Sequence, residues 1–239
     1  MSRPFALIVL VAAIAFAVAP FVTPPFTGYE PGQFPVDIPR PAIQPAGYAF
    51  AIWSVIFLWL IAHAGYGLWK RQDDPAWARV RPALTVALVL GTVWLAIAGA
   101  SPVWATAVIL VMAAAAILAF LQAPTEPDRW ILSAPLAIFA GWLTAASLVS
   151  SGILLAGYGY TGNEEAAYDM LGVILILTPL VQSRKPRMPV YSLTVVWAMV
   201  GVAVANWGSG SYVAWVALGI AALVLIAVGW LWRRGQRNF

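Results

Sequence analysis

Cysteine is absent from the 239 residues of this chain, and charged residues make up only 9% of them. The first absence excludes disulfides, thiolate metal sites and cysteine nucleophiles. The second excludes a soluble fold, because an ordinary soluble domain covers its surface with about 25% charged residues. Hydrophobic residues reach 62% instead, so lipid has to solvate most of the chain. The sequence therefore predicts an all-α integral membrane protein.

Eight long apolar runs divide the chain, and each is close to the roughly 20 residues that a membrane-spanning helix needs. The runs cover residues 5–22, 46–69, 82–100, 103–122, 130–157, 166–181, 188–207 and 212–232. Clusters of proline, glycine and charge separate them, which predicts about eight transmembrane helices joined by short connections. The run 166–181 is the weakest, because it is short and carries Asp169 near its start and Pro179 near its end.

The basic residues are distributed unevenly between the two sides of the predicted membrane. With the amino terminus in the cytoplasm, twelve of the thirteen Lys and Arg residues lie inside and only Arg40 lies outside. This count predicts that both termini are cytoplasmic, and we expect a bacterial inner membrane. It also explains the net charge of +4 without a nucleic-acid partner.

The first apolar run also has features of a signal peptide: Arg3 precedes the apolar core, and residues 17–19 offer a cleavage motif. Pro20 follows that motif directly and argues against cleavage, so we expect residues 1–19 to be retained as a helix. The segment 23–45 is rich in proline and glycine and is predicted to lie outside the membrane. A loop of this length in a compact protein is more typical of a lid or binding element than of a simple connection.

His63 is the one ionisable side chain predicted at mid-depth of a span. It is a candidate axial ligand for haem or a proton relay, or else a neutral imidazole bonded to a neighbouring helix. The sequence has no paired carboxylates within a span, no metal-ligand cluster and no phosphate-binding glycine loop. We therefore expect neither an enzyme nor a metal site.

Tryptophan is frequent, with 13 in the chain. Six lie at the ends of predicted spans, as in the aromatic belt of many membrane proteins: Trp69, Trp77, Trp130, Trp207, Trp230 and Trp232. Five lie well within the spans: Trp53, Trp59, Trp94, Trp142 and Trp197. These five are candidates for ligand contact, because an indole inside a span gives an aromatic wall to any cavity.

Helical spacing groups some of these residues onto common helix faces. In the run 46–69 that face consists of Phe50, Trp53 and Phe57. In the run 130–157 it consists of Trp142, Ala146 and Ser150. A flat indole beside small residues either admits a planar ligand or lets two helices approach closely.

The start of the second predicted helix resembles the translocator protein family, also called tryptophan-rich sensory proteins (TspO/MBR). In that family a proline-rich outer loop leads into Pro, Gly and an aromatic residue, followed by a Trp and, four residues later, a Tyr. The corresponding residues here are Pro45, Gly47, Tyr48, Trp53 and Phe57. Phe57 thus replaces the family's tyrosine.

The resemblance continues through the third to fifth helices. Its residues are Trp94, the short loop 101–102, Trp104, Pro135, Trp142, Ala146 and Ser150. Val93 replaces the asparagine that precedes the tryptophan in the family. Ser150 replaces the asparagine of the family's fifth helix. The match covers about residues 5–157, and the helices after it are similar to the extension of longer bacterial relatives.

The resemblance implies a five-helix bundle over residues 1–157, with a pocket opening toward the outer loop 23–45, and a three-helix extension over residues 158–239. It implies ligand contacts at Tyr48, Phe50, Trp53, Phe57, Trp94, Trp104, Trp142, Ala146 and Ser150. Members of the family hold tetrapyrroles or other flat hydrophobic molecules and often form homodimers.

We therefore expect a membrane binding and regulatory protein that holds a porphyrin-like or other planar hydrophobic ligand in an aromatic pocket. The main alternative is a transporter of a small lipophilic or neutral solute, and a third hypothesis is an enzyme that modifies a bound tetrapyrrole. No cofactor is assigned, and porphyrin or haem is expected as a ligand. The expected partners are membrane lipids and a lipophilic small molecule.

Overall fold

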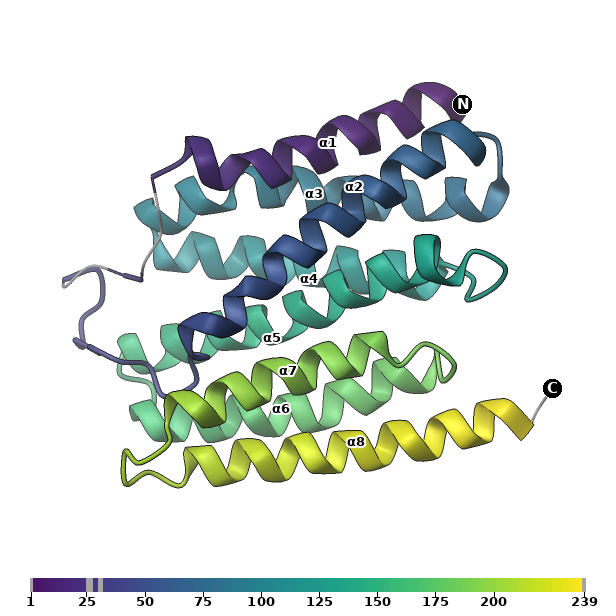
Figure 1. Cartoon of the computed structure of the whole chain (residues 1–239). Coiled ribbons are helices and arrows are strands. Elements are labelled where there is room, and N and C mark those ends of the chain that lie inside the picture. Colours follow the sequence, from purple (N-terminus) through teal and green to yellow (C-terminus); the bar gives the residue numbers. More distant parts are fainter. Residues whose placement is uncertain (1, 25–27, 30–31, 238–239) are drawn as a thin grey trace. The chain divides into compact units, whose positions relative to one another are not determined.

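The computed structural model describes residues 2–24, 28–29 and 32–237, and within these residues all regular structure is helical. Its α-helices, labelled in Figure 1, are α1 (Ser2–Val22), α2 (Ile52–Lys70), α3 (Pro75–Ala100), α4 (Pro102–Gln122), α5 (Ala134–Gly157), α6 (Asn163–Ser183), α7 (Val190–Ala205) and α8 (Val213–Arg237). A 3-10 helix, η1 (Gly47–Ala51), precedes α2, and a π-helix, η2 (Arg129–Ser133), precedes α5. Residues 25–27 and 30–31 of the predicted outer loop 23–45 lie outside the described residues.

Seven of the described helices are long and apolar enough to cross a membrane, which confirms the predicted all-α integral membrane fold. The eighth, α7, has 16 residues, so it is about 24 Å long against a hydrocarbon core of about 30 Å. It is shorter than predicted because it starts after Pro189 and ends at Asn206. The run 166–181 instead forms part of a full 21-residue helix, α6.

The third helix begins seven residues before its predicted start at residue 82. Asp74 caps it by accepting a 2.8 Å hydrogen bond from the backbone N–H of Ala76, and Pro75 occupies the first turn. Pro82 lies inside the helix instead of at its start. Arg81, which lies just before the predicted run 82–100, is therefore part of α3.

The described chain divides into two compact units, each described here by itself. Unit 1 comprises Met1–Tyr29 and Ile52–Leu143, and unit 2 comprises Glu30–Ala51 and Thr144–Phe239. The division falls within α5, between Leu143 and Thr144.

The second half of α5 belongs to unit 2 because of its contacts there. The hydroxyls of Thr144 and Tyr191 lie 3.1 Å apart. A Cβ atom at Gly152 would lie 3.1 Å from side-chain atoms of both Ile43 and Met170, so a side chain there would require these neighbours to shift.

In unit 1, α1 packs against α2 and α3, and α3 packs against α4. Gly91 makes the contact between α1 and α3 possible, because a Cβ atom there would lie 2.5 Å from Cε2 of Phe16. Phe16 is thereby buried against α3.

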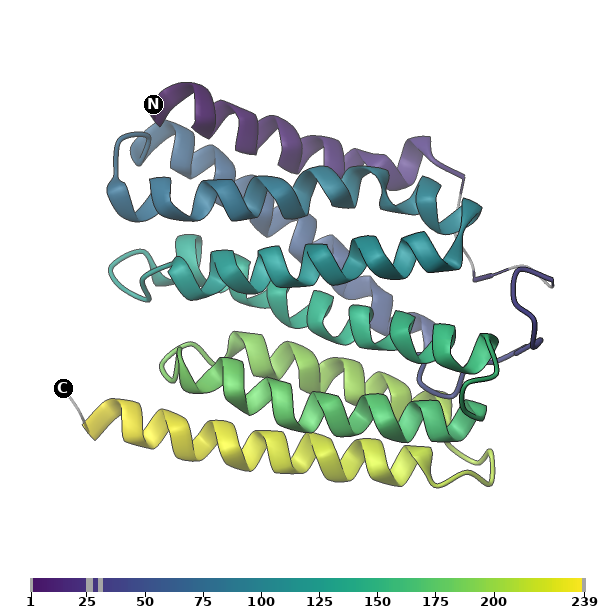
Figure 2. The ribbon, with the colours of Figure 1, turned by 180° about the vertical axis from the view of Figure 1, so that it is seen from behind.

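In unit 2, α6, α7 and α8 lie side by side (Figures 1 and 2). Polar side chains of two of these helices hold the segment 32–51. Asn163 accepts a 2.9 Å hydrogen bond from the backbone N–H of Ala42 and donates one of 3.0 Å to the carbonyl of Arg40. Asn206 donates a 2.8 Å hydrogen bond to the carbonyl of Ala42. The segment 32–51 is thus fixed on the first residue of α6 and on the residue that follows α7.

The end of this segment is held by α7. The backbone N–H of Ala46 donates a 3.0 Å hydrogen bond to the carbonyl of Gly201. This contact requires a glycine at position 201, because a Cβ atom there would lie 2.9 Å from the Cβ atoms of Pro45 and Ala49. The indole N–H of Trp197 donates a 3.0 Å hydrogen bond to the carbonyl of Ala49.

We expect Asn206→Ala to loosen the segment 32–51 and destabilise unit 2 by about 1–3 kcal/mol, because the carbonyl of Ala42 loses its buried donor. Hydrogen–deuterium exchange should show faster exchange of the amides of Ala42 and Ala46. Tyr212→Phe, at an exposed residue before α8, is the control. Unchanged exchange in Asn206→Ala would contradict this role.

Candidate functional site

Five aromatic side chains of unit 1 form one cluster, which we call the aromatic cluster. It consists of Phe16 of α1, Trp53 and Phe57 of α2, and Phe139 and Trp142 of α5. Phe16 lies at its centre, with its ring 5.6 Å from Trp53, 5.0 Å from Phe57 and 5.8 Å from Phe139 between centroids. The cluster thus joins three helices.

The two α2 residues of the cluster stack because they are four positions apart on one helix face. The ring centroids of Trp53 and Phe57 are 5.2 Å apart and their planes differ by 18°. The ring of Trp142 meets Trp53 edge-on at 6.1 Å. Trp142 is buried, whereas Trp53 and Phe57 are half-buried, so part of the stacked pair remains accessible.

Three of the nine predicted ligand-binding residues therefore come together in the aromatic cluster, namely Trp53, Phe57 and Trp142. The sequence analysis missed Phe16 and Phe139, which complete it. Both are ordinary phenylalanines in apolar runs, and no local pattern distinguishes them. The close approach at Gly91 identifies Phe16 only once the packing of α1 on α3 is known.

Two more predicted residues lie at the turn between α3 and α4. The indole N–H of Trp94 donates a 3.0 Å hydrogen bond to the carbonyl of Ala105 across this turn. Ser101 caps α4 by accepting a 3.4 Å hydrogen bond from the backbone N–H of Trp104. The side chain of Trp104 is 67% exposed, so it faces outward from the described structure.

The remaining four predicted residues belong to unit 2. Tyr48 meets Trp197 edge-on with 5.5 Å between ring centroids. Phe50 lies in η1 and is exposed, so the predicted α-helical spacing does not apply to it. Ala146 is half-buried and Ser150 buried in the second half of α5.

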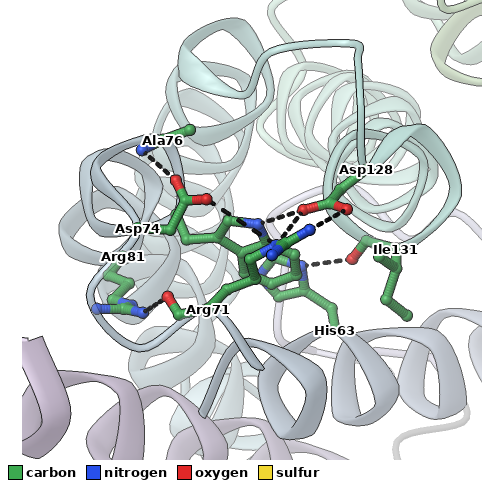
Figure 3. Close-up of polar contacts among 8 residues, drawn as sticks. His63, Arg71, Asp74, Ala76, Arg81, Asp128 and Ile131 are labelled. Carbon is green, nitrogen blue, oxygen red and sulfur yellow. Dashed lines mark hydrogen bonds and ion pairs between the residues drawn. The ribbon is translucent and has the colours of Figure 1, made fainter. Parts of the chain in front are cut away.

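A second group of unit 1 residues, which we call the polar cluster, gathers around Asp128 in the connection between α4 and η2 (Figure 3). The Asp128 carboxylate accepts hydrogen bonds of 2.8 and 3.2 Å from the Arg71 guanidinium and one of 2.9 Å from the indole of Trp77. The hydrogen bonds from Arg71 are the main reason that the pKa of Asp128 is lowered from its ordinary value. The same pairing raises the pKa of Arg71.

Trp77 corrects one of the sequence interpretations. It was expected in the interfacial belt, yet it is only 2% exposed, whereas Trp69, Trp130, Trp207 and Trp230 are at least half exposed. Its ring stacks on His63 with centroids 4.7 Å apart and planes 15° apart. A Cβ atom at Gly67 would lie 2.8 Å from the Trp77 ring. Trp77 therefore lies inside the packing of α2 and α3.

The surroundings of His63 match one of its interpretations, an imidazole that is hydrogen-bonded to a neighbouring helix. Its Nδ1 atom lies 2.8 Å from the carbonyl oxygen of Ile131 in η2, so Nδ1 carries the proton of this hydrogen bond (Figure 3). His63 is buried. Among the described residues, no group of three His, Cys, Asp or Glu side chains is placed to hold a metal ion.

Arg81 completes the polar cluster by holding the connection between α2 and α3. Its guanidinium donates hydrogen bonds of 2.8 and 2.9 Å to the carbonyls of Gln72 and Arg71, and Figure 3 shows it bent back toward this connection. These carbonyls follow the last turn of α2, where no helical donor is available. The polar cluster therefore fixes two connections of unit 1.

A family model described as TSPO-like protein matches residues 4–230. The chain belongs to the TSPO-like protein family. No curated protein and no solved structure matches the chain significantly. The family match includes α6, α7 and α8, whereas the resemblance described from the sequence ended at about residue 157. Membership of the TSPO-like family indicates a membrane protein with a role in ligand binding or transport.

We expect Asp128→Asn to lower the melting temperature by a few degrees at neutral pH, because Arg71 loses the nearer of its two carboxylate partners, Asp128 and Asp74. A carboxyl group with a lowered pKa stabilises the fold above its ordinary pKa of about 3.9 and loses this effect as the pH falls through the lowered value. The difference between wild type and variant should therefore shrink below about pH 4. Melting curves across pH would test this, and a difference independent of pH would contradict it.

Proposed function

We propose that this chain is a membrane binding protein that holds a planar hydrophobic ligand, such as a porphyrin, against the aromatic cluster. The observation that carries the proposal is the half-buried, stacked pair Trp53 and Phe57, backed by the buried rings of Phe16, Phe139 and Trp142. Flat aromatic faces bind flat ligands by burial and offset stacking. A mostly apolar, aromatic surface is typical of sites for lipophilic molecules.

The position of Trp53 along α2 favours a ligand with a polar edge. Trp53 is the second residue of α2, and Lys70 is the last, so about 25 Å of helix separates the two residues. The aromatic cluster therefore starts near one end of the span. A porphyrin bound there can bury its ring system while its carboxylates remain at the headgroup level, where charge costs little.

We expect Trp53→Leu to weaken protoporphyrin IX binding by about fivefold, because the ligand loses a stacking face worth roughly 1 kcal/mol beyond apolar burial. The measurement is a titration of tryptophan fluorescence quenching in lipid nanodiscs. Trp230→Leu, an exposed tryptophan of α8 in unit 2, is the matched control. Equal dissociation constants for wild type and both variants would refute the binding site.

Transport of a small lipophilic or neutral solute is the second candidate function. Membership of the TSPO-like family favours it, because this membership indicates a role in ligand binding or transport. Uptake of labelled porphyrin into proteoliposomes distinguishes the two functions. Saturable uptake would favour transport, and bound ligand without uptake would favour binding alone.

We further propose that both termini lie on the cytoplasmic side of a bacterial inner membrane. In unit 2 the basic residues lie at different ends of α6. The backbone carbonyl of Arg40 accepts a hydrogen bond from Asn163, the first residue of α6, whereas Arg184 follows the last residue of α6. Arg233 and Arg234 lie in the final turns of α8. Lys and Arg are enriched in cytoplasmic connections, which supports this orientation.

The absence of native cysteine allows a direct test of the orientation. In intact cells, a membrane-impermeant maleimide should label Ser209→Cys, in the connection between α7 and α8. It should label Gln236→Cys only after permeabilisation. The reverse pattern would place the termini outside.

A further inference from the structure

One end of unit 2 carries five basic residues, which we call the C-terminal basic cluster. It consists of Arg184, Lys185 and Arg187 from the connection between α6 and α7, and Arg233 and Arg234 from the end of α8. In both views of the chain, this connection lies beside the last turns of α8 (Figures 1 and 2). The cluster therefore combines two segments that are almost 50 residues apart in sequence.

Specific packing brings these two segments together. A Cβ atom at Gly235 would lie 3.2 Å from side-chain carbons of Pro186 and Arg187, so the backbone of α8 rests directly on the connection. The amide of Gln182 donates hydrogen bonds of 2.7 and 3.2 Å to the carbonyls of Lys185 and Met188. These bonds fix the connection on the end of α6, and the basic side chains are presented from an ordered surface.

The C-terminal basic cluster has no carboxylate side chain near it in the sequence. The last Asp or Glu of the chain is Asp169, which lies on α6 fifteen residues before Arg184, about 22 Å along the helix. Arg184, Arg233 and Arg234 are exposed. Burial lowers the pKa of Lys185 from its ordinary value, and a nearby anion would offset this effect.

Two basic residues of unit 1 differ, because each lies beside a carboxylate. Arg71 lies 2.8 Å from the carboxylate of Asp128, and Arg129 lies 2.7 Å from that of Glu126. A general preference for cytoplasmic Lys and Arg explains the positions of the basic residues in both units. It does not explain why residues 170–239 contain six Lys and Arg residues and no Asp or Glu residue.

We propose that the C-terminal basic cluster binds the phosphate groups of an anionic phospholipid, preferentially one with two phosphates. Trp230 is 52% exposed on α8, and the Arg234 guanidinium lies 3.8 Å from its ring centroid. An exposed tryptophan at a helix end is typical of the headgroup level, so the cluster lies where lipid phosphates are found. Arginine binds phosphate oxygens through paired N–H groups. A lipid with two phosphates can contact one group of cations in the connection between α6 and α7 and a second group at the end of α8. This inference is independent of the proposed function.

The test uses the full chain in phosphatidylcholine nanodiscs with and without cardiolipin or phosphatidylglycerol, with retained lipid counted by native mass spectrometry. Each cation near a lipid surface strengthens binding about fivefold. We therefore expect Arg184→Gln/Arg233→Gln/Arg234→Gln to lose at least about tenfold of its cardiolipin binding. The charge-matched control, Arg3→Gln/Lys70→Gln/Arg79→Gln, removes three exposed cations of unit 1 and should lose clearly less binding, because it leaves the C-terminal basic cluster intact.

A second variant separates loss of charge from loss of fold. Arg184→Lys/Arg233→Lys/Arg234→Lys preserves the charges and should retain most of the binding. Equal loss in the glutamine variant and the control would overturn the proposal, as would a wild type without preference for anionic lipid. Displacement of cardiolipin by inorganic phosphate at millimolar concentration would show a site for free phosphate and would also overturn it.

Discussion

Polar backbone groups that leave regular helix have to find partners inside this protein, because the hydrocarbon core of a membrane offers none. Tryptophan supplies many of these partners. The indole N–H groups of Trp59, Trp94 and Trp197 donate to the carbonyls of Trp130, Ala105 and Ala49. Two of these carbonyls belong to the irregular helices η1 and η2, where the normal helical pattern is interrupted. The high tryptophan content is therefore partly a structural requirement.

The same constraint separates the tryptophans that hold the fold from those that are available for a ligand. Trp77 bonds to Asp128 and packs on His63, so its role in unit 1 is structural. Trp53 instead is half-buried, and its ring stacks on that of Phe57. The proposed ligand surface rests on this pair, and the buried ring of Trp142 supports it through an edge-on contact with Trp53. In unit 2, Asn163 and Asn206 form hydrogen bonds with backbone groups of Arg40 and Ala42 in the segment 32–51. Holding this segment is a structural role of the helices after residue 157.

The sequence was a good guide wherever length and hydropathy decide the structure. The ends of α1, α4 and α6 lie within three residues of their predicted positions, because a span has to match the bilayer thickness. The sequence was a poor guide where the position of a residue depends on a contact with a residue distant in the chain. The start of α3 was missed although Asp74 and Pro75 are a recognisable helix start, because charge was taken to indicate a loop. The burial of Trp77 and the membership of Phe16 in the aromatic cluster depend on Gly67 and Gly91, whose partners no local pattern reveals.

The central claim of this account is that a planar ligand lies against the aromatic cluster of unit 1. Photo-crosslinking with a diazirine-bearing porphyrin, followed by peptide mapping, tests it most directly. The account predicts crosslinked peptides from α2 around Trp53 and Phe57, together with peptides that contain Phe16 or Phe139. Crosslinks confined to the lipid-exposed residues of α8, or spread evenly over all helices, would contradict it.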